Sequence, residues 1–157
     1  MKRPLAALLV AGSMTLAACG SSDSDSTPTA CLQGSEAYLA AVEDAPEAAL
    51  VDGSVPISDC LVPGQSSGEL NTVAESVIPA ATRLNAEVQR RPAGEAATEL
   101  GYLVGALEEG ASDTAGIHTD LIRRINSAAR FSDDPEGLGA RFERAYGAGY
   151  QAAREAG

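Results

Sequence analysis

The sequence has 157 residues, with 22 acidic and 11 basic side chains and a formal net charge of −11. One domain of roughly 100–150 residues fits this length, and the 45% apolar share argues against wholesale disorder. The negative charge excludes a typical nucleic-acid-binding protein, because neutralising phosphates requires a basic surface. One histidine and three cysteines are too few for most zinc sites. We therefore expect a small acidic globular protein with no nucleic-acid partner, metal or cofactor.

The first residues have the layout of an export signal. Lys2 and Arg3 precede an apolar run from Leu5 to Leu16, which is followed by small residues. A helix that spans a bilayer needs about 20 apolar residues, so this run is too short to remain as a span. We interpret residues 1–18 as a signal peptide that is removed on export.

The end of this signal, Leu16-Ala17-Ala18-Cys19, resembles the lipobox of bacterial lipoproteins. In that family the cysteine thiol receives a diacylglycerol, and a dedicated peptidase cuts just before it. The resemblance implies that an acylated Cys19 anchors the protein to a lipid bilayer. The anchored domain is then extracytoplasmic, on the cell membrane or on an outer membrane if one exists. The alternative is an ordinary signal followed by an unmodified Cys19.

Residues 19–30 contain no large apolar side chain, so burial cannot offset the entropy that ordering them costs. We predict a flexible tether here and a helical domain over residues 31–157. Without the signal the chain has 22 acids against 9 arginines, a net charge of −13. The arginines concentrate in the last third of the sequence, either as a solvated helix face or as a patch for an anionic partner.

Two cysteines remain once Cys19 is assigned to lipid. In an exported domain, Cys31 and Cys60 allow a single intrachain disulfide. It would close a loop of about 30 residues and stabilise the fold by roughly 3.5 kcal/mol in the chain-entropy account. The alternative is a pair of buried, unpaired thiols.

Helical periodicity is strong in four segments, and strand patterns are nearly absent. The first helix begins at Ser66, where Glu69 completes a capping box. It ends near Arg91, and Pro79 inside it is expected to kink the helix without dividing it. The other three helices are predicted over residues 92–110, 113–131 and 134–157, the last with an Asp-Pro-Glu start signal.

Short links make consecutive helices antiparallel neighbours. We therefore predict an all-α fold, an up-down four-helix bundle preceded by a short helical N-terminal section stapled by the disulfide. In that section residues 35–50 read as an amphipathic stretch and residues 51–64 as a loop. Ala97, Gly101 and Gly105 recur every four residues in the second helix, which predicts the close approach of a neighbouring helix.

The sequence contains no nucleophile-elbow serine and no phosphate-binding loop, and we predict that the protein is not an enzyme. His118 is predicted on the half-exposed flank of the third helix, with a general base or metal ligand as the alternative. Glu95 and Glu99 are interpreted as a charged flank, with a shared cation as the alternative. Glu87–Arg91 and Asp120–Arg124 are expected ion pairs.

An aromatic stripe marks the last helix. Phe142, Tyr146 and Tyr150 recur at four-residue steps, a pattern typical of a core. A buried tyrosine needs a partner for its hydroxyl, so these three residues and Tyr102 are the candidate lining of a ligand cleft.

These features together predict a membrane-anchored lipoprotein of the cell envelope. Its helical domain is expected to act without catalysis, by binding another envelope protein or by shaping an envelope assembly. The alternative is a carrier that binds a small ligand or a cation in the bundle interior.

Overall fold

The computed structural model describes residues 26–130 and 138–157. The signal peptide, Cys19 and the predicted start of the last helix at Asp134 lie outside the described residues. The elements in chain order are η1 (Thr29–Leu32), α1 (Ser35–Val42), β1 (Leu50–Val51), β2 (Val55–Pro56), η2 (Ile57–Cys60), α2 (Ser67–Arg90), α3 (Glu95–Ser112), α4 (Thr119–Ala128) and α5 (Gly139–Ala156). The all-α class is confirmed. Among the described residues, no helix is both long and apolar enough to cross a bilayer.

Helix α2 begins at the predicted capping box. Ser66 Oγ accepts the N–H of Glu69 at 3.2 Å, and the Glu69 carboxylate accepts the N–H of Ser66 at 3.2 Å. The helix then continues through Pro79 as one element of 24 residues. The helical periodicity places apolar residues on one face at steps of three and four, from Leu70 to Val88. All of them except Leu70 are buried, which confirms the periodicity: Ala74, Val77, Ala81, Leu84 and Val88.

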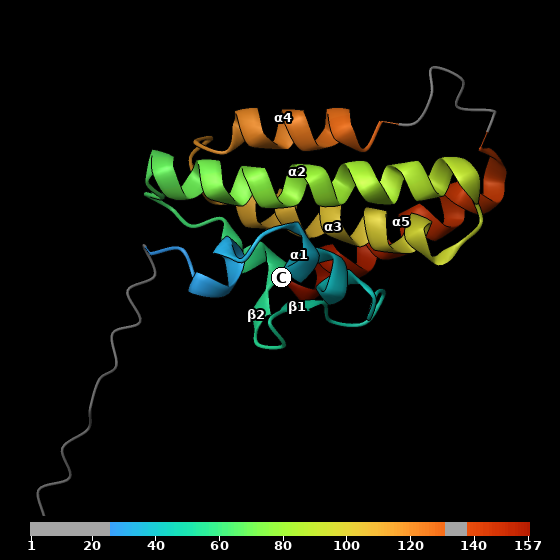
Figure 1. Ribbon diagram of the computed structural model, residues 1–157, viewed down its shortest axis with the longest axis horizontal. Coiled ribbons are helices and arrows are strands. Elements are labelled where there is room, and N and C mark those ends of the chain that lie inside the picture. Colours follow the sequence, from blue (N-terminus) through green and yellow to red (C-terminus); the bar gives the residue numbers. More distant parts are fainter. Residues whose placement is uncertain (1–25, 131–137) are drawn as a thin grey trace, which may run out of the picture.

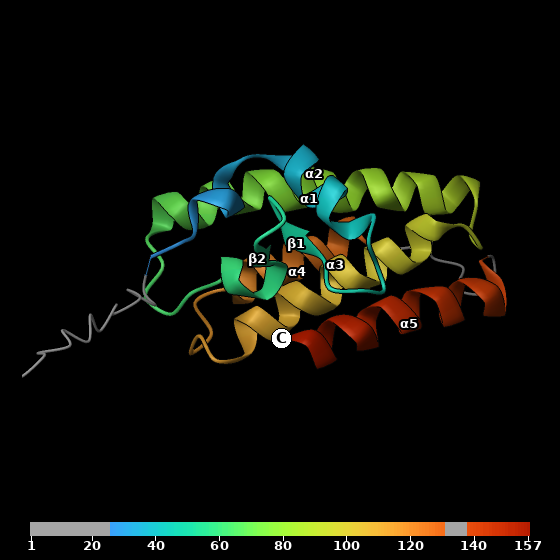
Figure 2. The same ribbon diagram turned by 90° about the horizontal axis from the view of Figure 1, so that it is seen from below.

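Helix α3 is the centre of the fold. Every residue from Leu100 to Leu107 is buried, and a helix buried all round needs neighbours on every side. Helices α1, α2 and α4 and the short η2 supply some of these neighbours, and α5 packs against α3 most extensively (Figure 2).

Glycines bring the backbones of α3 and α5 into direct contact. A Cβ atom on Gly101 would lie 2.1 Å from the carbonyl oxygen of Tyr146, and one on Gly105 would lie 2.6 Å from that of Tyr150. Gly149 makes the reciprocal contact from α5, where a Cβ atom would lie 2.0 Å from the Thr98 carbonyl oxygen. The close approach predicted from the four-residue spacing is confirmed.

The four long helices α2–α5 run in alternating directions (Figure 1). Their packing differs from that of a closed bundle, because α4 packs on α2 and α3 whereas α5 packs mainly on α3. Within the described residues, α4 and α5 share at most slight contact. Helix α1 occupies a further place on α2 and α3, so the N-terminal section belongs to the core and is not an appendage.

The Cys31–Cys60 disulfide joins η1 to η2, with an S–S distance of 2.02 Å and both residues fully buried. The predicted pairing is confirmed. The prediction of a loop over residues 51–64 was wrong in part, because this segment includes most of a short antiparallel hairpin and the helix η2. Asp52 and Gly53 turn the hairpin with φ of 52° and 66°, the left-handed conformation that Asp-Gly pairs favour. The predicted amphipathic stretch ends early, since α1 stops at Val42.

Two predicted boundaries move. The ordered fold begins before residue 31, because Thr27 and Ala30 are already buried. The third helix does not begin at Asp113: residues 113–118 form a turn, and α4 starts at Thr119. Ala115 and Gly116 adopt positive φ there, so the chain cannot continue as a helix. As a result Ile117, which an unbroken helix over residues 113–131 would place on its apolar inward face, is 44% exposed.

Candidate functional site

Five polar residues are buried among those described, and four of them form one connected group, the His118 network. Its members are Thr27, Gln65, Thr114 and His118. The fifth buried polar residue, Ser76, bonds to its own helix through the Thr72 carbonyl. A buried polar network in which every group is hydrogen-bonded rigidifies the segments that it joins. The His118 network therefore holds distant parts of the chain together.

The network extends from Thr27, in the segment before η1, to Thr114 and His118, in the turn before α4. His118 Nε2 lies 2.7 Å from Gln65 Oε1, and His118 Nδ1 lies 2.8 Å from Thr114 Oγ1. Gln65 Nε2 donates to Thr27 Oγ1 at 2.6 Å and to the carbonyl oxygen of Cys60 at 3.0 Å. One glutamine therefore connects the segment before η1, the disulfide and the buried histidine.

The hydrogen-bond pattern determines the imidazole tautomer. Both hydrogens of the Gln65 amide nitrogen are donated, so Oε1 accepts and His118 Nε2 carries a hydrogen. Thr114 Oγ1 donates its hydrogen to the carbonyl oxygen of Ala111 at 2.6 Å and lies 2.8 Å from His118 Nδ1. A protonated ring donates from Nδ1 to that hydroxyl oxygen and leaves the bond to Ala111 in place. In the neutral ring, the hydroxyl hydrogen turns from Ala111 to Nδ1.

His118 is fully buried, so its predicted place on a half-exposed flank was wrong. Burial lowers the pKa of His118 from its ordinary value of 6.5, because removal from water disfavours the charged ring. The neutral imidazole therefore predominates at pH 7. Among the described residues, no group of three or more His, Cys, Asp or Glu side chains is arranged to hold a metal ion.

A cavity of about 470 Å³ lies beside the network, and we name it the foot pocket. Thr114 belongs to both, since it lines the cavity and bonds His118. Ser26 and Pro28 contribute to the lining from the segment before η1, and Leu61 and Val62 contribute apolar surface. The remaining residues that line the foot pocket are Ser58, Asp59, Pro63, Glu109, Gly110, Asp113 and Gly157.

The candidate aromatic cleft is only partly assembled. The Phe142 and Tyr146 ring centroids are 5.6 Å apart, and those of Tyr146 and Tyr150 are 6.3 Å apart. Tyr150 donates its hydroxyl to Glu108, and this bond, followed by burial, raises the Tyr150 pKa. Burial, with a smaller effect of Glu108, raises the pKa of Tyr146 to about 12. Tyr102 is buried in α3, and its hydroxyl accepts the N–H of Ala49 at 3.1 Å.

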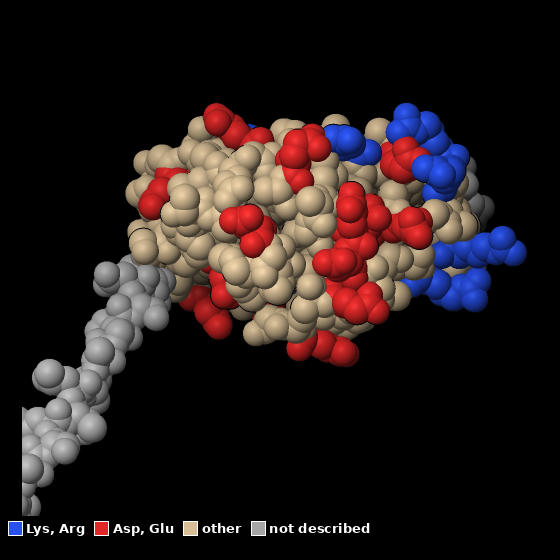
Figure 3. Space-filling view, turned by 60° about the horizontal axis from the view of Figure 1, so that its bottom comes forward, with Lys and Arg blue, Asp and Glu red and all other residues tan. Residues whose placement is uncertain are grey.

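Acidic side chains are scattered over the face in Figure 3 and gather in one cluster, and the arginines visible in this view lie toward one end of it. A groove of about 380 Å³ here contains Glu99. Burial, followed by repulsion from Glu95, Glu43 and Glu87, raises the Glu99 pKa.

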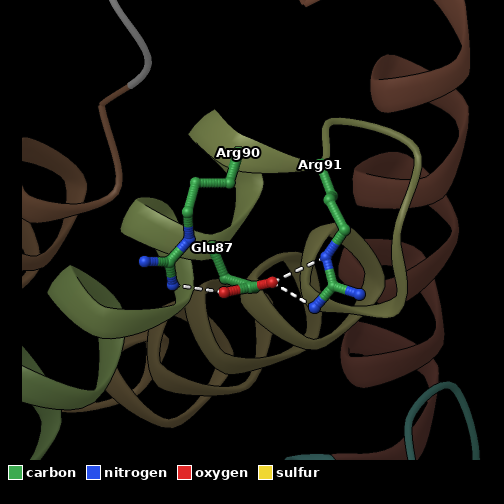
Figure 4. Close-up of polar contacts among 3 residues, drawn as sticks. All are labelled: Glu87, Arg90 and Arg91. Carbon is green, nitrogen blue, oxygen red and sulfur yellow. Dashed lines mark hydrogen bonds and ion pairs between the residues drawn. The ribbon is translucent and has the colours of Figure 1, made fainter.

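Glu87, at the edge of the groove, is neutralised by Arg90 and Arg91 (Figure 4). Its hydrogen bonds to Arg91 and then to Arg90 lower its pKa. The Glu87–Arg91 pair is confirmed, whereas Asp120 pairs with Arg123 and not with Arg124.

Sequence reasoning missed Thr27, Gln65 and Thr114. Gly116, inside a segment interpreted as helix, was the available signal for a turn that buries His118. Nothing in the local sequence indicates that Gln65 meets a residue 53 positions away. Comparisons with protein-family models, with curated proteins and with solved structures find no match to this chain.

Proposed function

We propose that the protein is a lipid-anchored protein of the cell envelope, held to a bilayer by an acylated Cys19, and that its helical domain acts by binding another envelope protein. The structural observation that carries this proposal is the buried Cys31–Cys60 disulfide. Disulfides persist in oxidising compartments and are rare in the cytosol, so the pairing supports export. The lipobox resemblance at Leu16–Cys19 supports the anchor.

A lipid anchor makes a membrane-binding surface on the domain unnecessary. Each buried CH₂ of an acyl chain contributes about 0.8 kcal/mol, and two chains on one residue give a long-lived attachment. The seven peptide steps from Cys19 to Ser26 reach at most about 25 Å when extended. The domain is therefore expected to act close to the bilayer to which it is anchored.

The experiment compares wild type with Cys19→Ala in intact cells, using a short crosslinker, fractionation and identification of the crosslinked residues. We expect the wild type to fractionate with membranes and to crosslink reproducibly to one envelope protein through residues of the helical domain. The Cys19→Ala form is expected to lose both properties while keeping its disulfide. A wild type that is recovered in the soluble fraction contradicts the anchor, and one that gives no specific crosslink contradicts the protein-binding role.

A carrier function is the second candidate, and the foot pocket is the observation that favours it. Its volume of about 470 Å³ falls within the usual range for small-molecule sites. The pocket lies at the edge of the fold, unlike the predicted interior site. Native mass spectrometry of protein purified from its own cell envelope distinguishes the two roles. A carrier is expected to retain a bound small molecule, and replacing Val62 in the pocket lining by a larger residue is expected to displace that molecule.

A further inference from the structure

The foot pocket is built where segments that are far apart in the chain meet. The C-terminal turn of α3 provides Glu109 and Gly110, and η2 provides Ser58 and Asp59. The backbones of α3 and η2 touch at this point, because a Cβ atom on Gly110 would lie 2.1 Å from the Ser58 carbonyl oxygen. Backbones packed this closely leave the two elements little freedom to move apart or together. One part of the pocket wall is therefore fixed by main-chain packing.

Other parts of the wall are held by the disulfide and by the His118 network. Leu61 directly follows Cys60 of the disulfide, and Thr114 lies in hydrogen-bond contact with the buried ring of His118. Leu61 and Thr114 both line the pocket although each is only 3% exposed. Sites for small molecules are usually formed before the ligand arrives, because walls that must be ordered on binding weaken the affinity. The foot pocket meets this condition.

The charges at the foot pocket are one-sided. Among the described residues that line it, three are acidic and none is basic: Asp59, Glu109 and Asp113. Glu109 is neutralised by Arg154, whose guanidinium lies 3.0 Å from the carboxylate. Within residues 26–130 and 138–157, neither Asp59 nor Asp113 forms an ion pair. Two carboxylates at the pocket are therefore left without a cationic partner in this part of the chain.

The end of α3 adds negative potential at the same place. The last carbonyl groups of a helix lack intrahelical partners and carry its negative partial charge, so basic residues are favoured there. The last turn of α3 has no basic residue, and it contains Glu109 and is followed by Asp113. The sequence thus places acids where a helix favours a cation. A departure from local preference of this kind is expected at a functional site.

Apolar surface lies beside these charges. Leu61 and Val62 are buried residues of the lining, and Pro28 and Pro63 contribute further apolar atoms. In the part of the chain that the structure describes, no three carboxylates, imidazoles or thiols are arranged to hold a metal ion. A volume of about 470 Å³ also exceeds what one metal ion needs. The lining therefore fits an organic cation with an apolar part.

We propose that the foot pocket binds a small organic amine, with its ammonium group beside Asp59 and Asp113 and its apolar part against Leu61 and Val62. An ammonium group donates charge-assisted hydrogen bonds to carboxylates. The inference rests on the proposed function, because it names the ligand class of the carrier role. A free amine fits the pocket better than the ammonium headgroup of a phospholipid, whose phosphate would lie close to the same carboxylates.

The test is an NMR titration of the chain carrying Cys19→Ser, which prevents acylation, so that it does not depend on the anchor. Three probes share a phenyl ring and differ in charge: phenethylamine, 2-phenylethanol and 3-phenylpropionate. We expect phenethylamine to shift the amide signals of Asp59, Gly110 and Thr114 saturably and to bind about tenfold more tightly than 2-phenylethanol. The carboxylate 3-phenylpropionate is expected not to bind.

Three results would overturn the proposal. The first is the absence of a saturable shift at the pocket amides, and the second is an equal shift at Glu99, which would show general attraction to acidic surface. The third is a response to bicelles containing phosphatidylethanolamine but not to phenethylamine, which would make the ligand a lipid. Equal affinity for phenethylamine and 2-phenylethanol contradicts the amine class alone. The carrier role fails separately, when protein purified from its own envelope retains no small molecule.

Matched variants assign the binding to the pocket carboxylates. Asp59→Asn and Asp113→Asn each remove one charge with little change of shape, and each is expected to weaken phenethylamine binding by about threefold to fivefold. Asp44→Asn removes one charge from an exposed residue outside the lining and is expected to bind as wild type. Retention of the Cys31–Cys60 disulfide and of the amide spectrum verifies the fold of each variant. Equal weakening in Asp44→Asn and Asp113→Asn would attribute the binding to net charge and overturn the assignment.

Discussion

The Nε2 atom of His118 lies 2.7 Å from the Oε1 atom of Gln65, and both side chains are buried although 53 positions separate them in the chain. This contact ties the turn before α4 to the segment that leads from the disulfide into α2. It also makes the only histidine of the sequence a structural group of the core. The stability of the domain should consequently depend on the charge of one imidazole.

The first prediction concerns pH. The pKa of His118 is lowered by burial, whereas in the unfolded chain it is near 6.5. The unfolded state therefore binds the proton first, and stability contributed by the neutral ring is fully present above pH 6.5 and is lost as the pH falls from there through the folded pKa. Chemical unfolding at several pH values should show this loss in wild type. The difference in the free energy of unfolding between wild type and His118→Gln should diminish as the pH falls below 6.5. A difference that stays constant with pH would contradict the burial of His118 as a neutral ring.

The second prediction concerns the contact between α3 and α5. Gly149→Ala places a Cβ atom about 2.0 Å from the Thr98 carbonyl oxygen, so the helices must move apart. We expect a loss of about 1–3 kcal/mol in the free energy of unfolding. Gly147 is the matched control, since nothing lies within 4 Å of its added Cβ. Gly147→Ala should stabilise α5 by up to about 1 kcal/mol. Equal effects of the two substitutions would refute the close backbone contact.

A third prediction concerns the disulfide. Replacing Cys31 and Cys60 together by alanine should lower the free energy of unfolding by about 3.5 kcal/mol, because the bond closes a loop with a sequence separation of 29. A reducing agent should lower the unfolding midpoint of wild type and leave that of the double variant unchanged. If thiol labelling shows that the reductant has opened the disulfide of wild type and the unfolding midpoint still does not change, the bond contributes nothing to stability.

The fourth prediction concerns Glu99. Burial and the repulsion of neighbouring carboxylates raise its pKa above the ordinary 4.5, so the ionised form destabilises the fold at neutral pH. Glu99→Gln should therefore raise the free energy of unfolding at pH 7, and the gain should disappear as the pH falls below 4.5, where wild type is protonated in both states. Glu155→Gln, at an exposed position of α5, should show no such gain. An equal gain in both variants would point to net charge and not to the groove.

Local signals in the sequence predicted α2 and α3 well. The Ser66–Glu69 capping box and the four-residue glycine spacing each specify a short-range geometry, and both are found in the structure. The Cys31–Cys60 pairing was predictable because no other pair remained once Cys19 was assigned to lipid. These features depend on neighbouring residues or on simple elimination.

What could not be predicted depends on long-range contacts. Helical periodicity continues across Ala115 and Gly116, yet the left-handed turn there ends the helix and inverts the burial of Ile117 and His118. The burial of Thr27 and the bond that it accepts from Gln65 have no local signature either. The aromatic stripe of α5 was visible as a pattern, but the hydroxyl of Tyr102 reaches Ala49 and not the stripe.

The lipid anchor proposed for Cys19 makes this residue the first of the exported protein. The anchor is tested most directly by intact and N-terminal peptide mass spectrometry of protein extracted from the membranes of its own cells. We expect the chain to begin at Cys19, with the mass of a diacylglycerol on its sulfur and the Cys31–Cys60 disulfide intact. A chain that begins elsewhere, or an unmodified Cys19, would contradict it.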